Sequence, residues 1–187
     1  MGDKKAKGLG KRLKKHDYVL MLMRHCKTEG ANAEGDLHRE LTDKGLKQAK
    51  RMAEGLKECG LVPDRIACSA AERARQTMDR MLEVFGDDPK VLCHMSLYEE
   101  GMQAVWEQLG QVPAKTRRFM VIGHEPTIST VAGWIASQDS DPSLLALLGV
   151  GVSTGSVVVF GGDKPFDQWQ PHDAELLAVL SPRDFKD

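Results

Sequence analysis

The chain has 187 residues, of which 41% are hydrophobic and 28% are charged, and its formal net charge is −1. This composition predicts one globular domain with an ordinary hydrophobic core. The balanced charge gives no overall signal for nucleic-acid binding, and no apolar run approaches the ~18 residues typical of a membrane span. Because no export signal is visible either, we expect a cytoplasmic protein with no membrane partner.

Basic residues are concentrated at the start of the chain. Residues 1–16 hold seven Lys or Arg residues against one acidic residue, Asp3. This segment has no apolar periodicity, which predicts a disordered, solvated arm at 1–16 and a single domain at 17–187. The alternative for the arm is docking to an acidic partner or to nucleic acid, and nucleic acid is not otherwise expected as a partner.

Strand-like and helix-like runs alternate after the arm. Four β-α repeats predict an α/β three-layer sandwich, with a mostly parallel central sheet of about six strands and helices on both faces. Short apolar runs predict strands at 17–24, 64–69, 90–97, 118–124, 155–161 and 174–180. Helical periodicity predicts helices at 41–60, 69–86, 101–111 and 127–137, and a further short helix within 139–154.

Two of these helices have recognisable start signals. Thr42 is a candidate N-cap for the helix at 41–60, whose expected apolar stripe includes Leu46. Ser69 and Glu72 have the spacing of a capping box for the next helix. The second signal places the helix start at the carboxyl end of the predicted strand 64–69.

The four cysteines are Cys26, Cys59, Cys68 and Cys93. None forms a C-x-x-C pair and their spacing matches no zinc framework, so we expect reduced thiols and no metal site. Cys68 and Cys93 lie inside apolar runs and are expected to be small core residues.

Polar side chains follow four of the predicted strands. In an open α/β sheet, ligands bind beyond the carboxyl ends of the strands. Two arginines can grip a phosphoryl group, a neutral imidazole can attack phosphorus, and a carboxyl group can protonate the leaving atom. This chemistry requires neither a metal nor a cofactor. The residues at or just after the strand ends are Arg24, His25, Arg73, Glu99, Glu100 and His124.

Five segments resemble the histidine phosphatase superfamily, which has the phosphoglycerate mutase-like fold, and in particular its short SixA-type phosphohistidine phosphatases. They occur in the family's order between about residue 18 and residue 132. The segments are LMRHCKTEGAN (22–32), HRELTDKGLKQA (38–49), CSAAERARQT (68–77), LYEE (97–100) and VIGHEPTIS (121–129).

The resemblance implies a role for each matching residue. Arg24 and Arg73 would bind phosphate, His25 would be the nucleophile, and His124 would be the second phosphate-binding histidine. Glu99 would be the general acid and base.

Three neighbouring choices accompany these assignments. Glu100 is an alternative to Glu99, because the two are adjacent. Arg75 points nearly opposite to Arg73 on a helix, so we expect it to be solvated. Arg39 matches a family arginine and is expected to pair structurally, with a phosphate-rim role as the second possibility.

Cys26 stands where the family usually has glycine. A cysteine nucleophile of the tyrosine phosphatase kind would need an arginine six positions later, where this chain has Asn32. We therefore expect His25 to react and Cys26 to keep an ordinary backbone conformation. Cys26 would be oxidation-sensitive if the nearby positive charge favours its thiolate.

The sequence thus predicts a metal-independent phosphatase that works through a phosphohistidine on His25. Residues 98–117 offer no long insertion that could cover a small substrate, which favours a SixA-like phosphatase acting on phosphohistidine in proteins. The alternative substrate is a small phosphate ester hydrolysed at the same residues. An alternative of another class is a non-catalytic phosphate-binding or scaffolding protein.

Overall fold

The strands alternate in which face they bury, and this alternation builds two cores. In β1 (Tyr18–Arg24), Met21 and Met23 pack on one side of the sheet, and Leu20 and Leu22 pack on the other. Because side chains alternate along a strand, this fully apolar segment can be buried on both faces. The computed structural model describes residues 3–31 and 33–185.

The six strands form one sheet in the order β3-β2-β4-β1-β5-β6. The first four strands in the chain are parallel, and β5 and β6 pair antiparallel at one side. This confirms the predicted mostly parallel sheet. The other strands are β2 (Arg65–Ser69), β3 (Lys90–His94), β4 (Arg118–Gly123), β5 (Val157–Gly162) and β6 (Glu175–Leu180).

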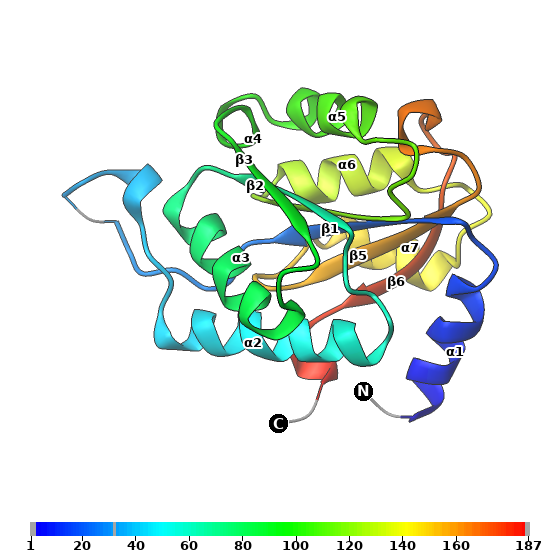
Figure 1. The fold of residues 1–187 in the computed structure, drawn as a ribbon, viewed down its shortest axis with the longest axis horizontal. Coiled ribbons are helices and arrows are strands. Elements are labelled where there is room, and N and C mark those ends of the chain that lie inside the picture. The colour runs from blue at the N-terminus through cyan, green and yellow to red at the C-terminus, as the bar shows by residue number, and fades with distance from the viewer. Residues whose placement is uncertain (1–2, 32, 186–187) are drawn as a thin grey trace.

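Helices cover both faces of the sheet, as Figure 1 shows. The helices α2 and α3 pack on one face, and α5, α6 and α7 contribute to the core on the other. No helix within the described residues is both long and apolar enough to cross a membrane. The helices are α1 (Asp3–Leu13), α2 (Asp43–Glu58), α3 (Glu72–Phe85), α4 (Ser96–Glu99), α5 (Met102–Gln111), α6 (Thr127–Ile135) and α7 (Pro142–Gly149).

The amino-terminal arm differs from the expected disordered tail, because the structure forms helix α1 there. Leu9 is buried against the core on the α2 side of the sheet. Arg12 donates hydrogen bonds of 2.8 Å to the carbonyl oxygens of Leu176 and Leu177, and pairs with Glu175 at 2.9 Å. The arm thus packs along β6, the edge strand of the sheet, which the local sequence could not indicate.

The start signals of α2 and α3 had different outcomes. Thr42 caps α2 by accepting a hydrogen bond from the amide of Gly45, as predicted. The capping box at α3 is wrong, because the N-cap is Ala71 and has no side-chain cap. Ser69 is instead turned toward His124, with its Oγ 2.7 Å from Nε2 of that histidine.

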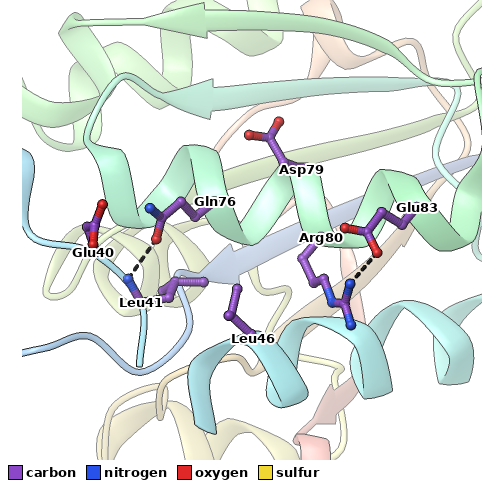
Figure 2. A pocket seen from close by; sticks show the side chains of 7 residues that line it. All are labelled: Glu40, Leu41, Leu46, Gln76, Asp79, Arg80 and Glu83. Carbon is purple, nitrogen blue, oxygen red and sulfur yellow. Dashed lines mark hydrogen bonds and ion pairs between the residues drawn. The ribbon is translucent and has the colours of Figure 1, made fainter. Parts of the chain in front are cut away.

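Two residues expected in the core lie at the surface. Leu46 is 37% exposed and lines a groove between α2 and α3, which Figure 2 shows. The groove also carries Glu40, Asp79 and the ion pair of Arg80 with Glu83. Cys93 is exposed because β3 is an edge strand, whereas the paired Cys68 on β2 is buried as predicted.

Candidate active site

Two adjacent strands deliver the two histidines to the same point. Arg24 at the end of β1 is in register with Gly123 at the end of β4. The next residues are His25 and His124, whose ring centroids lie 5.1 Å apart. The amide of His25 also donates to the carbonyl of Gly123, at 3.0 Å. The parallel pairing of β1 with β4 therefore fixes the spacing of the two imidazoles.

Helix α3 adds an arginine to this pair. Arg73 lies in the first turn of α3, is only 6% exposed, and donates from Nε to Nε2 of His25 at 3.3 Å. Arg75 is exposed and lies 3.9 Å from Glu72 of its own helix. Of the two arginines, the structure thus brings Arg73 to the histidines and leaves Arg75 in solvent.

The hydrogen bonds of His25 fix its tautomer. Its Nδ1 lies 2.7 Å from the carbonyl oxygen of Cys26, which can only accept, so Nδ1 carries the proton. Burial lowers the pKa of His25 to about 4, and the charges of Arg73 and Arg24 act in the same direction. The Cys26 hydrogen bond opposes the shift without cancelling it. His25 is therefore neutral near neutral pH, and Nε2 presents a lone pair toward Arg73.

His124 is also held neutral. Burial lowers its pKa to about 3, with the charges of Arg73 and His25 contributing. The Oγ of Ser69 accepts from the amide of Ala71 at 3.3 Å, so its own hydrogen can go to Nε2 of His124. That arrangement leaves the His124 proton on Nδ1, which is buried and has no partner among the described residues. An unpaired buried donor beside His25 suits a bound anion.

Arg24 supplies a second unpaired donor. Its Nη1 donates to the carbonyl oxygen of Val152 at 2.9 Å, which anchors the guanidinium. Its Nε is buried and has no partner within the described ranges. Together with Nδ1 of His124, this gives the site two buried nitrogen atoms whose hydrogen bonds the protein itself does not complete.

Asp36 is a residue of this site that sequence reasoning missed. It accepts from Arg73, with Nη2 2.9 Å from its Oδ2, and from Arg39, with Nη1 2.9 Å from its Oδ1. The hydroxyl of Tyr98 donates to the same carboxylate at 3.1 Å. The hydrogen bond from Arg39 is the largest cause that lowers the pKa of Asp36 to about 2. Asp36 is therefore ionised and competes for the same guanidinium that a phosphate would use.

Arg39 makes structural contacts in the loop that carries Asp36. Besides Asp36, its guanidinium donates to Thr28 Oγ1 at 2.6 Å and to the carbonyl of Glu29 at 2.9 Å. Its contacts fit the expected structural pairing role. Because the loop is held in this way, Arg39 positions Asp36 rather than pointing at His25.

The candidate carboxylic acids lie further out. Glu99 is the last residue of α4 and Glu100 follows it, and both side chains are exposed. Neither side chain forms a hydrogen bond or ion pair with the residues that the structure describes. Tyr98, from the same helix, does reach the site, with its ring centroid 5.7 Å from that of His124. The structure thus places both carboxylates at the rim and does not choose between them.

Cys26 faces away from the reactive centre. It is fully buried in the core on the α2 side of the sheet, and its amide donates to Thr77 Oγ1 at 3.0 Å. Burial raises the pKa of the Cys26 thiol to about 12, so the condition set for oxidation sensitivity, a favoured thiolate, is not met. Its φ is not positive, as predicted, since His172 is the only non-glycine residue with positive φ in the described part of the chain.

Within the described ranges, no group of three or more His, Cys, Asp or Glu side chains could hold a metal ion. Apart from the Asp36 carboxylate, which is bound to Arg73, the polar groups around His25 include the hydrogen-bond donors Arg24, Arg73 and His124. Such a donor set matches a phosphoryl dianion.

Comparisons with known proteins agree with this chemistry. Residues 20–119, more than half of the chain, match the model of the histidine phosphatase superfamily, branch 1. The uncharacterized protein Rv1276c of Mycobacterium tuberculosis is 27% identical over 162 residues, covering 86% of this chain and 100% of that protein.

Solved structures give the same result. A structure from Nakamurella multipartitia, assigned as the phosphohistidine phosphatase SixA, has 28% identity and a TM-score of 0.76. It covers 88% of this chain and 96% of that one. The protein histidine phosphatase SixA complexed with tungstate has 19% identity and a TM-score of 0.70, covering 89% and 98%, and this likeness shows the fold alone. The chain therefore belongs to branch 1 of the histidine phosphatase superfamily and is a phosphatase similar to its SixA-type members.

Proposed function

We propose that this phosphatase forms a covalent phosphohistidine at Nε2 of His25 and hydrolyses it. The observation that carries the proposal is the fixed tautomer of His25. Its Nδ1–H is held by the Cys26 carbonyl at 2.7 Å, and its Nε2 lone pair lies 3.3 Å from Nε of Arg73. A neutral imidazole between cationic donors can attack phosphorus without first losing a proton.

The donors around His25 would bind the transferring phosphoryl group. Arg73 has five N–H groups, of which the three hydrogen bonds to His25 and Asp36 use three, so two remain for an anion. Of the buried nitrogen atoms without a partner among the described residues, Arg24 Nε and His124 Nδ1 are the two at this site. Donors that are already in place stabilise the charge that develops on the equatorial oxygens in the transition state.

The leaving group needs a proton, and the candidates are Glu99 and Glu100. By resemblance Glu99 has this role, and Glu100 remains the alternative. Asp36 is nearer to Arg73, but Arg73, Arg39 and Tyr98 already donate hydrogen bonds to its carboxylate. We therefore assign the general acid and base to the α4 rim, where the carboxyl groups are exposed to solvent and to an incoming substrate.

The substrate that we propose is phosphohistidine carried by a protein. The segment between β3 and β4 folds into only the short helix α4 and the helix α5. Glu99 and Glu100 are exposed, so the rim is open to a large partner. Similarity to the Nakamurella multipartitia protein, assigned as a phosphohistidine phosphatase, supports the same substrate class. A small phosphate ester is the alternative.

The decisive experiment is to trap and locate the phosphoenzyme. The wild type should yield an acid-labile adduct on residue 25 after rapid quenching with a phosphoramidate substrate, and His25→Ala should yield none. Cys26→Ser is the matched control and should still form the adduct. An adduct on residue 26, or equal turnover by wild type and His25→Ala, would contradict the mechanism. Turnover of phenyl phosphate but not of the phosphoramidate would favour the ester substrate.

A further inference from the structure

A cavity on the α2 side of the sheet is lined by α2 and by the segments 153–154 and 181–183. It has a volume of about 660 Å³, and ten described residues line it. Five of the ten are basic and none is acidic. In a chain whose net charge is only −1, such a one-sided lining is unusual, and clefts of one sign concentrate the electrostatic field. The basic residues are Lys27, Lys44, Lys47, Arg51 and Arg183.

The wall of this cavity is attached to the backbone of the phosphate site. Lys27 comes two residues after His25 in the chain. On the opposite side, Ser153 and Thr154 line the cavity just before Gly155, whose amide donates to the carbonyls of Arg24 and His25, at 3.1 Å each. A ligand in the cavity would therefore contact segments that adjoin His25 and Gly155 in the chain.

Three of the cations form a row along α2. Positions 44, 47 and 51 recur at the spacing of one helix face, and the row extends over about 10 Å. An extended peptide covers this length with about three residues. Lys44 and Lys47 are exposed, and neither forms an ion pair with another residue that the structure describes.

We propose that this cavity binds an acidic stretch of the protein that carries the phosphoryl group. The inference deepens the proposed protein substrate and rests on it. Lysines at three of the five positions suit carboxylates spread along a surface, whereas tight phosphate recognition favours the fork of arginine. None of the lining residues is aromatic, so the cavity offers no stacking surface for the bases of a nucleic acid.

Binding can be tested without any catalysis. The probe is a fluorescent, unphosphorylated tetraglutamate peptide, measured by anisotropy at low salt against the full chain. Lys44→Glu/Lys47→Glu should weaken binding by about tenfold or more, and added salt should weaken binding to the wild type. Lys90→Glu/Lys115→Glu is the matched control, because it makes the same charge change at exposed lysines outside the cavity. Equal affinity of the two double variants would overturn the proposal.

Turnover then separates this inference from the proposed function. A phosphohistidine peptide flanked by glutamates should have a lower KM than the same peptide flanked by glutamines, and Lys44→Glu/Lys47→Glu should abolish the difference. Phenyl phosphate turnover should be unchanged, which shows that the variant is folded and active. If tripolyphosphate binds more tightly than the peptide and loses affinity in the same variant, the cavity belongs to a small polyanion and the acidic-protein occupant is wrong. A missing adduct on His25 would contradict the catalytic mechanism but leave the binding result standing.

Discussion

The buried neutral state of His25 should be visible in the pH dependence of folding. Its pKa is about 4 in the folded protein, against an ordinary value of 6.5. Between these values the unfolded chain takes up a proton that the folded protein does not. The contribution of neutral His25 to the free energy of unfolding is therefore fully present above pH 6.5 and is lost as the pH falls toward 4. The difference between the two pKa values corresponds to about 3 kcal/mol of unfolding free energy, of which about 2 kcal/mol should be lost near pH 5.

Urea unfolding of the wild type and His25→Gln measures this contribution. Substitution changes stability at every pH, but the other titrating groups are shared, so the change between about pH 7 and about pH 5 isolates His25. The wild type should lose about 2 kcal/mol more than the variant over this interval. Parallel pH profiles would refute a neutral buried imidazole. An NMR titration of the His25 ring, with a midpoint near the unfolded value, would refute it independently.

Three further predictions concern the surroundings of His25. Asp36→Asn removes the anion that competes for the guanidinium of α3, so inhibition by inorganic phosphate should tighten by about fivefold, and weaker inhibition would show that Asp36 mainly positions the arginine. Iodoacetamide should label Cys93 before Cys26, because Cys93 is exposed and its pKa is lowered to about 7, whereas Cys26 is buried. Peptide mass spectrometry measures the order of labelling, and the reverse order would contradict the burial of Cys26. Glu99→Gln should slow hydrolysis of an ester with a poor leaving group by about 100-fold, and Glu100→Gln by far less, in steady-state assays; the opposite ranking would assign the proton transfer to Glu100.

The centre of the site was predictable because strand ends determine it. Arg24, His25 and His124 follow buried apolar runs, and Arg73 follows a third strand within one helical turn. Parallel strands in one sheet present their carboxyl ends at one edge, so these side chains had to meet. The register of β1 with β4 fixes the spacing of His25 and His124, and the first turn of α3 places Arg73.

Asp36 and Ser69 were not predictable in the same way. Asp36 lies in a loop without periodicity, and its partner Arg73 is 37 positions away. A lone aspartate there has no local signal. Ser69 had a strong local signal for capping, but the packing of β2 beside β4 offers its hydroxyl to His124 instead. Tertiary contacts determine the hydrogen-bond partners of both side chains, and for Ser69 they override the local preference for capping.

The same reasoning explains the amino-terminal arm. Its basic composition indicates a solvated segment, yet Leu9, Arg12, Leu13 and His16 all have partners in the fold. The partners of Arg12, and Glu175 as a partner of His16, lie on β6, about 160 positions later in the chain. Arg12 donates hydrogen bonds to backbone carbonyl oxygens at the edge of the sheet. These hydrogen bonds also protect that edge from pairing with another chain.

Cys26 shows how a change at a motif position can be absorbed elsewhere. A side chain at this position must fit into the core next to the loop that precedes β5. The chain has Gly155 there, at φ +75°, and an ideal Cβ on that glycine would lie 3.2 Å from Cys26 Sγ and 3.1 Å from Pro182 Cγ. Cys26 thus occupies space that Gly155 leaves free, and Gly155 still holds the carbonyls of Arg24 and His25 through its amide. Because the thiol packs away from Nε2 of His25, the position tolerates a side chain without disturbing the nucleophile.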